Sequence, residues 1–251
     1  MKFRLTALGL HLLASAVALT LVFGTLHLGW YRWPGWYLAD VSKVVFVMAG
    51  VDLGVGPLLT FVVAGASKPR RVLARDIAVI VAIQIFALIY GTMSLWNGRP
   101  LYYAFSENVL QIVQAYDIDP HEWALARRQK SELVPHWYSL PRWIWAPLPQ
   151  DSNERDRIVA SAVGGGNDVI SMPRYFKRWE LGLGTLRTQL KKVDDLGYFS
   201  SVEKKVLKER MRAAGLATDQ PNSLPLTGRG RPLLAVFDPS SLRIAAIFKG
   251  A

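Results

Sequence analysis

Residues whose types could do chemistry are few and scattered in this sequence. The four histidines stand at positions 11, 27, 121 and 136, and none belongs to an HExxH or other metal-ligand spacing. There is no cysteine, which excludes thiolate metal sites, disulfides and cysteine catalysis. A GxSxG nucleophile elbow is also missing. The sequence therefore predicts no catalytic residue, no metal and no cofactor, and we expect the protein not to be an enzyme.

One short pattern resembles a catalytic motif. Ser201-Val202-Glu203-Lys204 matches the SxxK of serine–lysine acylases, but the SDN and KTG partners of that chemistry are missing. Ser200 and Glu203 instead have the spacing of a capping box at the start of a helix. The pattern is therefore more economically explained as a helix N-terminus.

Asp52 stands out because of where it lies. It interrupts an apolar run from Val44 to Ala66 that has no other charged residue. A carboxylate in such a run is costly and usually faces protein or water rather than lipid. Polar residues of the neighbouring apolar runs offer internal partners, namely His11, Thr25, His27 and Gln84. The other two interpretations are a contact with the transmembrane helix of a partner protein and a proton or ion pathway.

The residues around Asp52 predict close contact between helices. Gly50 and Gly54 form a small-xxx-small pair, which lets another helix approach closely. Pro57, preceded by Gly56, removes a backbone hydrogen bond and should kink the helix. With Asp52, these four residues are candidates for binding a partner.

Three apolar segments are long enough to cross a membrane as helices, at about residues 8–30, 44–66 and 77–96. The first also resembles a signal peptide, because Lys2 and Arg4 precede it and Ala14-Ser15-Ala16 or Ala16-Val17-Ala18 fits a cleavage site. Its apolar run continues to Trp30, so we expect the segment to be retained as a helix.

The distribution of positive charge predicts the orientation. Lys2 and Arg4 precede the first segment, and the 67–75 loop carries Lys68, Arg70, Arg71 and Arg75. The positive-inside rule then places the N-terminus and this loop in the cytoplasm and residues 98–251 outside. Aromatic residues at the expected outer ends agree: Trp30, Tyr31, Trp33, Trp36, Tyr37 and Trp96. We therefore expect a multi-pass protein with a transmembrane domain, 1–97, and an outer domain, 98–251.

The outer domain has the pattern of an α+β fold. Strands at 101–105 and 109–115 predict one hairpin, and strands at 233–237 and 242–248 predict a second. Helices are expected at about 120–130, 152–163, 179–195 and 200–215, and a loop at 218–231. The fold class is membrane α-helical, with three transmembrane helices, plus a C-terminal α+β soluble domain.

Residues 135–149 are rich in proline and aromatic side chains. Four prolines exclude a regular helix. Trp137, Trp143 and Trp145 are candidates for contact with a partner or with the membrane surface, and the alternative is an extended segment that covers the core. The net charge of +11 lies partly at the ends of the apolar segments, so we expect no nucleic acid partner.

Several separate motifs resemble the type IV pilin accessory proteins. They are Gly50-Val51-Asp52 with Gly56-Pro57-Leu58-Leu59-Thr60, Lys68-Pro69-Arg70-Arg71, Arg75-Asp76, Arg99-Pro100-Leu101-Tyr102, Gly165-Gly166-Asn167-Asp168 with Pro173-Arg174-Tyr175, and Leu224-Pro225-Leu226. Two features depart from the family pattern: Asn167 replaces a proline, and the tail ends Phe248-Lys249-Gly250-Ala251 rather than with Pro-Trp.

The resemblance implies a protein of the bacterial inner membrane, with a periplasmic C-terminal domain, that assists assembly of its cognate type IV pilin. Its partners would be that pilin, other pilus assembly proteins and membrane lipid, and it brings no known catalytic site. The alternatives are a membrane-anchored periplasmic ligand-binding sensor, an outer-face enzyme with an unrecognised site, and a small transporter that uses Asp52.

Overall fold

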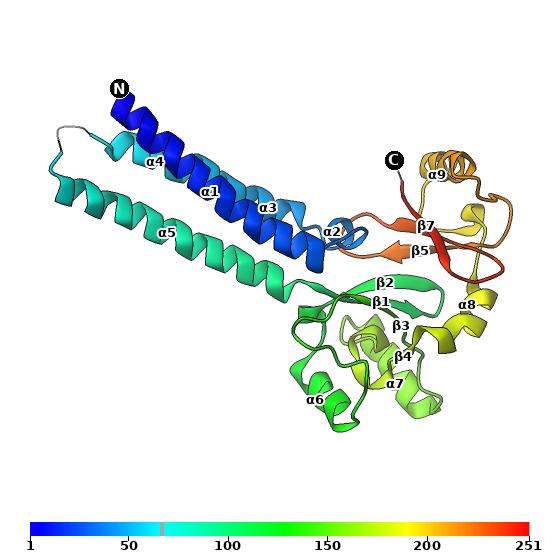
Figure 1. Cartoon of the computed structure of the whole chain (residues 1–251). Coiled ribbons are helices and arrows are strands. Elements are labelled where there is room, and N and C mark those ends of the chain that lie inside the picture. The colour runs from blue at the N-terminus through cyan, green and yellow to red at the C-terminus, as the bar shows by residue number, and fades with distance from the viewer. Residues whose placement is uncertain (66–67, 251) are drawn as a thin grey trace. The chain divides into compact units, whose positions relative to one another are not determined.

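The computed structural model describes residues 1–65 and 68–250. The chain divides into two compact units, Met1–Gly98 and Arg99–Ala251 (Figure 1). Within the described residues, the first unit consists of helices and the second contains a seven-stranded sheet.

The first unit has three helices that are long and apolar enough to cross a membrane, among the residues described. They are α1 (Lys2–Gly29), the segment Ser42–Val63 and α5 (Arg70–Asn97), with a short helix α2 (Gly35–Leu38) after α1. The expectation of three apolar helices is confirmed. The end expected for the second one, at Ala66, lies outside the described residues.

The second apolar helix is irregular around Asp52. It consists of α3 (Ser42–Ala49), a π-helical segment (Gly50–Val55) and α4 (Gly56–Val63). Wide π turns inside α-helices are uncommon and often occur at functional sites. Pro57, which has no N–H to donate, stands in the first turn of α4. The irregularity expected at Pro57 thus takes the form of a π-helical segment directly before it.

Two glycines let α5 approach the second apolar helix closely. A Cβ on Gly56 would lie 2.0 Å from Nε2 of Gln84, and a Cβ on Gly91 would lie 2.5 Å from Sδ of Met48. Real Cβ atoms do not come this close to other atoms. The two helices can therefore pack at this separation only because glycine has no side chain at these positions.

Hydrogen bonds join α1 to the other long helices near its start and just after its end. Nε of Arg4 in α1 donates to the carbonyl of Ala64, just beyond α4, at 2.8 Å. The hydroxyl of Tyr31, after the end of α1, donates to the carbonyl of Leu95 in α5 at 2.7 Å. Such bonds matter because a terminal carbonyl without a partner is costly in an apolar environment.

The second unit is built on one sheet, with the strand order β4-β3-β1-β2-β5-β6-β7 among the described residues. The strands are β1 (Pro100–Ser106), β2 (Val109–Gln114), β3 (Arg142–Trp145), β4 (Lys177–Arg178), β5 (Ser223–Thr227), β6 (Leu233–Phe237) and β7 (Ile244–Lys249). The antiparallel pairs β1–β2 and β6–β7 are the two expected hairpins. Parallel pairing of β2 with β5 joins these hairpins into a single sheet.

The expectation of a loop over residues 218–231 is wrong, because β5 lies within it. Proline is rare inside central strands, so Ser-Leu-Pro-Leu-Thr gives a weak strand signal. The register with β2 covers Leu226 and Thr227, and Pro225 falls outside it. Leu224 and Leu226 are fully buried. Tertiary burial thus decides a conformation that local propensity disfavours.

Four α-helices of the second unit flank the sheet in the described chain: α6 (Pro120–Arg128), α7 (Ser152–Val163), α8 (Leu183–Gln189) and α9 (Ser201–Ala213). Ser200 and Glu203 form the expected capping box. The helix expected over 179–195 is too long. It is replaced by a 3₁₀ turn (Trp179–Gly182), α8 and a second 3₁₀ turn (Val193–Asp195), because Lys191 between them pairs with Ser223.

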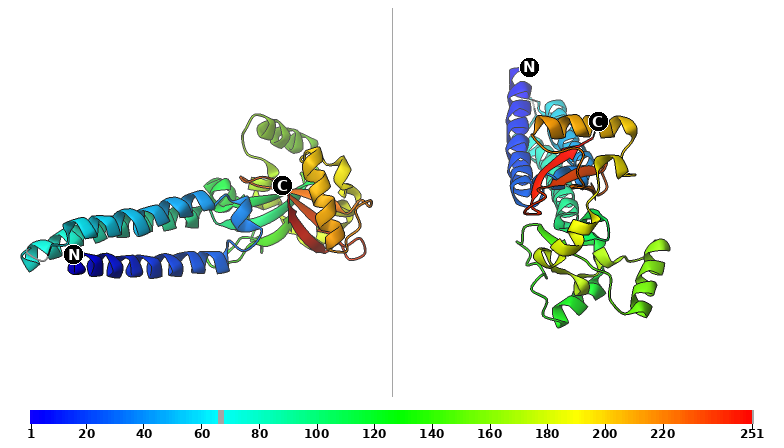
Figure 2. Two further views of the ribbon diagram at one scale, coloured as in Figure 1. Left: turned by 90° about the horizontal axis from the view of Figure 1, so that it is seen from above. Right: turned by 90° about the vertical axis from the view of Figure 1, so that its right-hand side faces the viewer.

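Two hydrophobic clusters hold the helices on the sheet. The first joins Tyr102 and Ile144 of the sheet to Ile158 of α7 and to Phe176. The second joins Leu234 and Val236 of β6 to Leu207 and Met211 of α9. Figure 2 shows α9, in orange, beside the C-terminal strands. Each of the two expected hairpins therefore has its own core.

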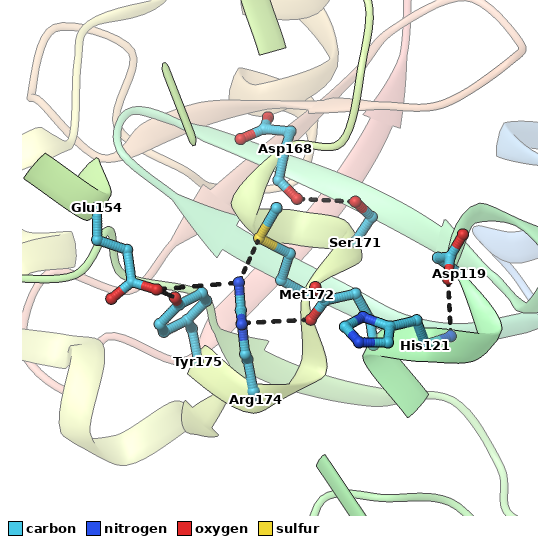
Figure 3. Close-up of polar contacts among 9 residues, drawn as sticks. Asp119, His121, Glu154, Asp168, Ser171, Met172, Arg174 and Tyr175 are labelled. Atoms are coloured by element: carbon cyan, nitrogen blue, oxygen red, sulfur yellow. Dashed lines mark hydrogen bonds and ion pairs between the residues drawn. The ribbon is translucent and has the colours of Figure 1, made fainter. Parts of the chain in front are cut away.

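Two ion pairs of the half-buried Arg174 fasten α6 and α7 to the 3₁₀ turn Pro173–Tyr175 (Figure 3). Nε of Arg174 lies 3.3 Å from Oε2 of Glu122 in α6, and Nη2 of Arg174 lies 3.9 Å from Oε1 of Glu154 in α7. Tyr175 donates a hydrogen bond to Glu154, and burial together with this bond raises the pKa of Tyr175 to about 12. The Pro-Arg-Tyr motif is therefore a structural clamp.

We expect Arg174→Ala to lower the free energy of unfolding of the second unit by about 3 kcal/mol, because it leaves the buried Glu122 carboxylate without its countercharge. Arg178→Ala is the control, since it breaks an exposed ion pair with Glu180 and should cost less than about 1 kcal/mol. Hydrogen–deuterium exchange of α6 in the full-length protein measures the loss of stability in each of the two variants. Equal exchange in the two variants would contradict the clamp.

We expect Gly56→Ala to lower the free energy of unfolding of the first unit by about 1–2 kcal/mol. The new methyl group would displace the Gln84 amide from its hydrogen bonds with His11 and Asp52. Gly54→Ala should be tolerated, since no described atom lies within 4 Å of its added Cβ. Thermal denaturation of the two variants in the same detergent compares them. A lower midpoint for Gly54→Ala than for Gly56→Ala would contradict this packing.

Candidate functional site

The candidate site lies in the first unit, where polar side chains from three helices meet inside apolar surroundings. Asp52 and Thr60 come from the second apolar helix, His11 from α1 and Gln84 from α5. Asp52, Thr60 and Gln84 are buried, with exposed fractions of 4%, 2% and 8%. Polar groups are rare at such positions because each must find a partner within the protein.

These side chains form a continuous hydrogen-bonded network. Nδ1 of His11 lies 2.6 Å from Oγ1 of Thr60, and Nε2 of His11 bonds Oε1 of Gln84. Nε2 of Gln84 donates to the backbone carbonyl of Asp52 at 3.3 Å and to its Oδ1 at 3.5 Å. A neutral imidazole that donates from Nε2 to the Gln84 oxygen must accept from the Thr60 hydroxyl at Nδ1. The network therefore ties α1, α4 and α5 together.

The structure gives Asp52 an internal partner, Gln84. His11 belongs to the network but reaches Asp52 through Gln84. Thr25 instead donates to the carbonyl of Leu21 in its own helix at 2.7 Å, and the His27 ring packs edge-on against Trp36 at 5.5 Å. Within residues 1–65 and 68–250, no three His, Asp or Glu residues are grouped so as to hold a metal ion.

The network forms the polar floor of a groove between α1 and α5. The groove has a volume of about 540 Å³. Its α1 wall carries four small residues, Ala7, Ala14, Ser15 and Ala18, together with Phe3, Thr6 and Leu10, and its α5 wall consists of Ile77, Val81, Ile85 and Leu88. Leu10 and Ile85 at the groove are 64% and 52% exposed. The groove is therefore open on one side, apolar along its walls and able to hydrogen-bond at its base.

The two glycines of the small-xxx-small pair face away from this groove. Gly50 is exposed and Gly54 half-buried, whereas Asp52 between them is buried. Apart from the adjacent residues and the backbone of the same helix, no described atom lies within 4 Å of a Cβ built on either glycine. Asp52 and the glycine pair thus lie on different faces of the helix.

The three candidate tryptophans do not form one surface. Trp137 is 71% exposed. Trp143 and Trp145 belong to β3 and are half-buried, and the Trp143 ring stacks on Tyr103 at 4.7 Å. Trp145 packs so closely on Gly182 that a Cβ there would lie 2.6 Å from its ring. The interpretation as an extended, core-covering segment is therefore confirmed for residues 142–145.

Sequence reasoning missed Thr60 as a member of the polar network. Its signal was present, because Thr60 follows Asp52 by eight residues, a spacing that falls within one broad stripe of a helix surface. Threonine is common in apolar helices, where its hydroxyl can donate a hydrogen bond to the backbone of its own helix. The residue type alone therefore did not indicate a contact with another helix. The contact with His11 comes from the packing of α1 on α4.

Comparison with known proteins finds relatives in Dichelobacter nodosus. The fimbrial assembly proteins of serogroup E1 and of serogroup I are each 25% identical over 235 residues, which is 92% of this chain and 89% of each relative. The fimbrial assembly protein of serogroups C1 and C2 is 31% identical over 110 residues, which is 44% of this chain and 84% of that protein. No family model and no solved structure matches.

The similarity reaches both units of the chain, because 235 matched residues exceed the length of either unit. It also agrees with the motifs of the sequence, which are spread from Gly50 to Leu226. The chain belongs to the family of fimbrial assembly proteins, the pilus assembly accessory proteins that its motifs resemble.

Proposed function

We propose that this protein assists assembly of a cognate type IV pilin at the bacterial inner membrane by binding the pilin subunit, without catalysis. Membership of the fimbrial assembly family supports a role in pilus assembly. The observation that carries the binding proposal is the open groove with a hydrogen-bonded floor in an otherwise apolar helical unit.

Three helices of the first unit would cross the membrane, with the N-terminus and the loop before α5 in the cytoplasm. The basic residues Lys68, Arg70, Arg71 and Arg75 around that loop support this orientation. Three crossings then place the second unit in the periplasm. There it would meet the soluble part of a pilin subunit before assembly.

The groove would receive the hydrophobic N-terminal helix by which a pilin subunit sits in the membrane. Lipid tails are as apolar as the helices, so association within the membrane depends on close packing and hydrogen bonds rather than on the hydrophobic effect. Small residues on the α1 wall allow close approach, and His11 and Gln84 offer atoms that can exchange hydrogen bonds with a polar group of the incoming helix. The open face with Gly50 and Gly54 offers a second docking surface.

The function predicts the phenotype of a deletion. We expect loss of the gene in its native host to reduce surface pili while pilin remains in the membrane, if the protein delivers subunits. Electron microscopy of the cells and immunoblots of membrane pilin measure the two quantities side by side. Unchanged pili and unchanged pilin would overturn the proposed function.

Complementation of that deletion then tests the docking surfaces. Ala14→Phe fills the groove, and we expect it to reduce piliation. Leu13→Phe is the matched control, because it adds bulk to the neighbouring position of α1, where Leu13 is 62% exposed and outside the groove. Asp52→Asn and Gly54→Leu test the polar floor and the glycine face. Full piliation with all of these variants at normal protein levels would reject docking in the membrane.

The orientation can be tested because the chain has no cysteine of its own. We expect a single cysteine at Val163, which is 85% exposed in the second unit, to react with a membrane-impermeant maleimide in spheroplasts. A cysteine at Arg71, which is exposed at the start of α5, should react after lysis and not before. Labelling in the reverse pattern would place the second unit in the cytoplasm.

A further inference from the structure

The second unit exposes a group of large side chains that its own core does not use. Trp137, Tyr138 and Leu140 are 71%, 59% and 50% exposed. They lie in the segment 136–140, which we name the aromatic turn. Grouped exposed apolar side chains often mark an interaction site, whereas single ones need no explanation.

The aromatic turn is held in one conformation. Oγ of Ser139 accepts a hydrogen bond from the backbone N–H of His136 at 2.9 Å, and the N–H of Ser139 donates to the carbonyl of His136 at 3.0 Å. The His136 ring stacks on Tyr138 at 5.3 Å, and Trp137 meets Tyr138 edge-on at 5.5 Å. Little conformational freedom is therefore lost when these rings bind a surface.

The aromatic turn and the residues just before it are also anchored to the sheet. Tyr102 of β1 donates a hydrogen bond to the carbonyl of Leu133 at 2.5 Å, and Nη2 of Arg142 in β3 lies 3.4 Å from Oγ of Ser139. The exposed rings thus project from a fixed base rather than from a loose loop.

Positive charge adjoins the aromatic turn along the chain. Arg127, Arg128 and Lys130 are exposed at the end of α6, and Arg142 follows the turn. Glu132 is the one acidic residue between Arg127 and Arg142. The segment therefore pairs interfacial aromatic residues with a net positive charge, a combination that suits the anionic headgroup surface of a bilayer.

We propose that the aromatic turn binds the lipid headgroup surface of the membrane, with Trp137 and Tyr138 at the interface and the nearby basic residues against anionic headgroups. β1 begins at Pro100, three residues after α5 ends at Asn97, so the second unit is tethered next to the membrane that the first unit is proposed to cross. Tethering raises the effective concentration of the lipid surface, which allows a small contact to suffice. This inference rests on the proposed membrane crossing and not on pilin binding.

A lipid contact of this kind would attach the second unit at two points, its tether to α5 and the aromatic turn. It would limit how freely the unit tilts at the membrane surface. The surfaces that meet a partner would then be presented in a restricted orientation.

The test uses the full-length chain with one spin-labelled cysteine, reconstituted in vesicles of phosphatidylethanolamine and phosphatidylglycerol. We expect a label at Tyr138→Cys to collide several-fold less with a water-soluble nickel chelate, and more with oxygen, than a label at Val163→Cys. Val163 is the matched control because it is 85% exposed in the same unit. Equal accessibility of the two labels to the nickel chelate overturns the proposal.

A second arm separates lipid from protein as the source of shielding. Replacing phosphatidylglycerol by phosphatidylcholine should raise the collision of the Tyr138→Cys label with the nickel chelate. Reversing the charge with Arg128→Glu and Lys130→Glu should have the same effect. Shielding that persists unchanged under both would assign the contact to protein and overturn the lipid proposal. Whether the second unit lies inside or outside the vesicle, it is next to a lipid surface. Neither outcome therefore depends on the topology of the protein or on the presence of a pilin.

Discussion

The first unit depends on one constraint, which is that a polar group among apolar helices must find its partner inside the protein. The network from Thr60 through His11 and Gln84 to Asp52 meets this constraint by drawing on all three long helices. Gly56 makes it possible, because any side chain there would occupy the place of the Gln84 amide. The network thus sets the separation of α1, α4 and α5, and the groove above it is a consequence of that separation.

Close approach of two helices and hydrogen bonding between them usually occur at the same contact, but here they belong to two different surfaces, the glycine face and the groove. Close approach without polar groups is offered by Gly50 and Gly54 on the open face, whereas hydrogen bonding is offered inside the groove by His11 and Gln84. A helix bound in the groove would exchange bonds with a network that is already satisfied, so binding need not be irreversible. Transient binding is what an assembly protein requires if it releases the subunit to a growing fibre.

The second unit solves a different problem, since it must join two hairpins that are distant in sequence. The parallel pair β2–β5 joins them, and Arg174 ties α6 and α7 to the 3₁₀ turn Pro173–Tyr175. The family motif Pro173-Arg174-Tyr175 is explained by this clamp, and no binding role has to be invoked for it. Among the exposed large side chains of this unit, those of the aromatic turn are grouped within a few residues of one another, which is why they are informative.

The sequence by itself determined the three apolar helices, the two hairpins and the capping box at Ser200, because each depends on residues that are close along the chain. It also marked Asp52 as exceptional and named Gln84 among its partners. The tertiary structure alone decided that Thr60 joins the network and that β5 is a strand in spite of Pro225. These features depend on contacts between distant segments, where burial and pairing outweigh local propensity.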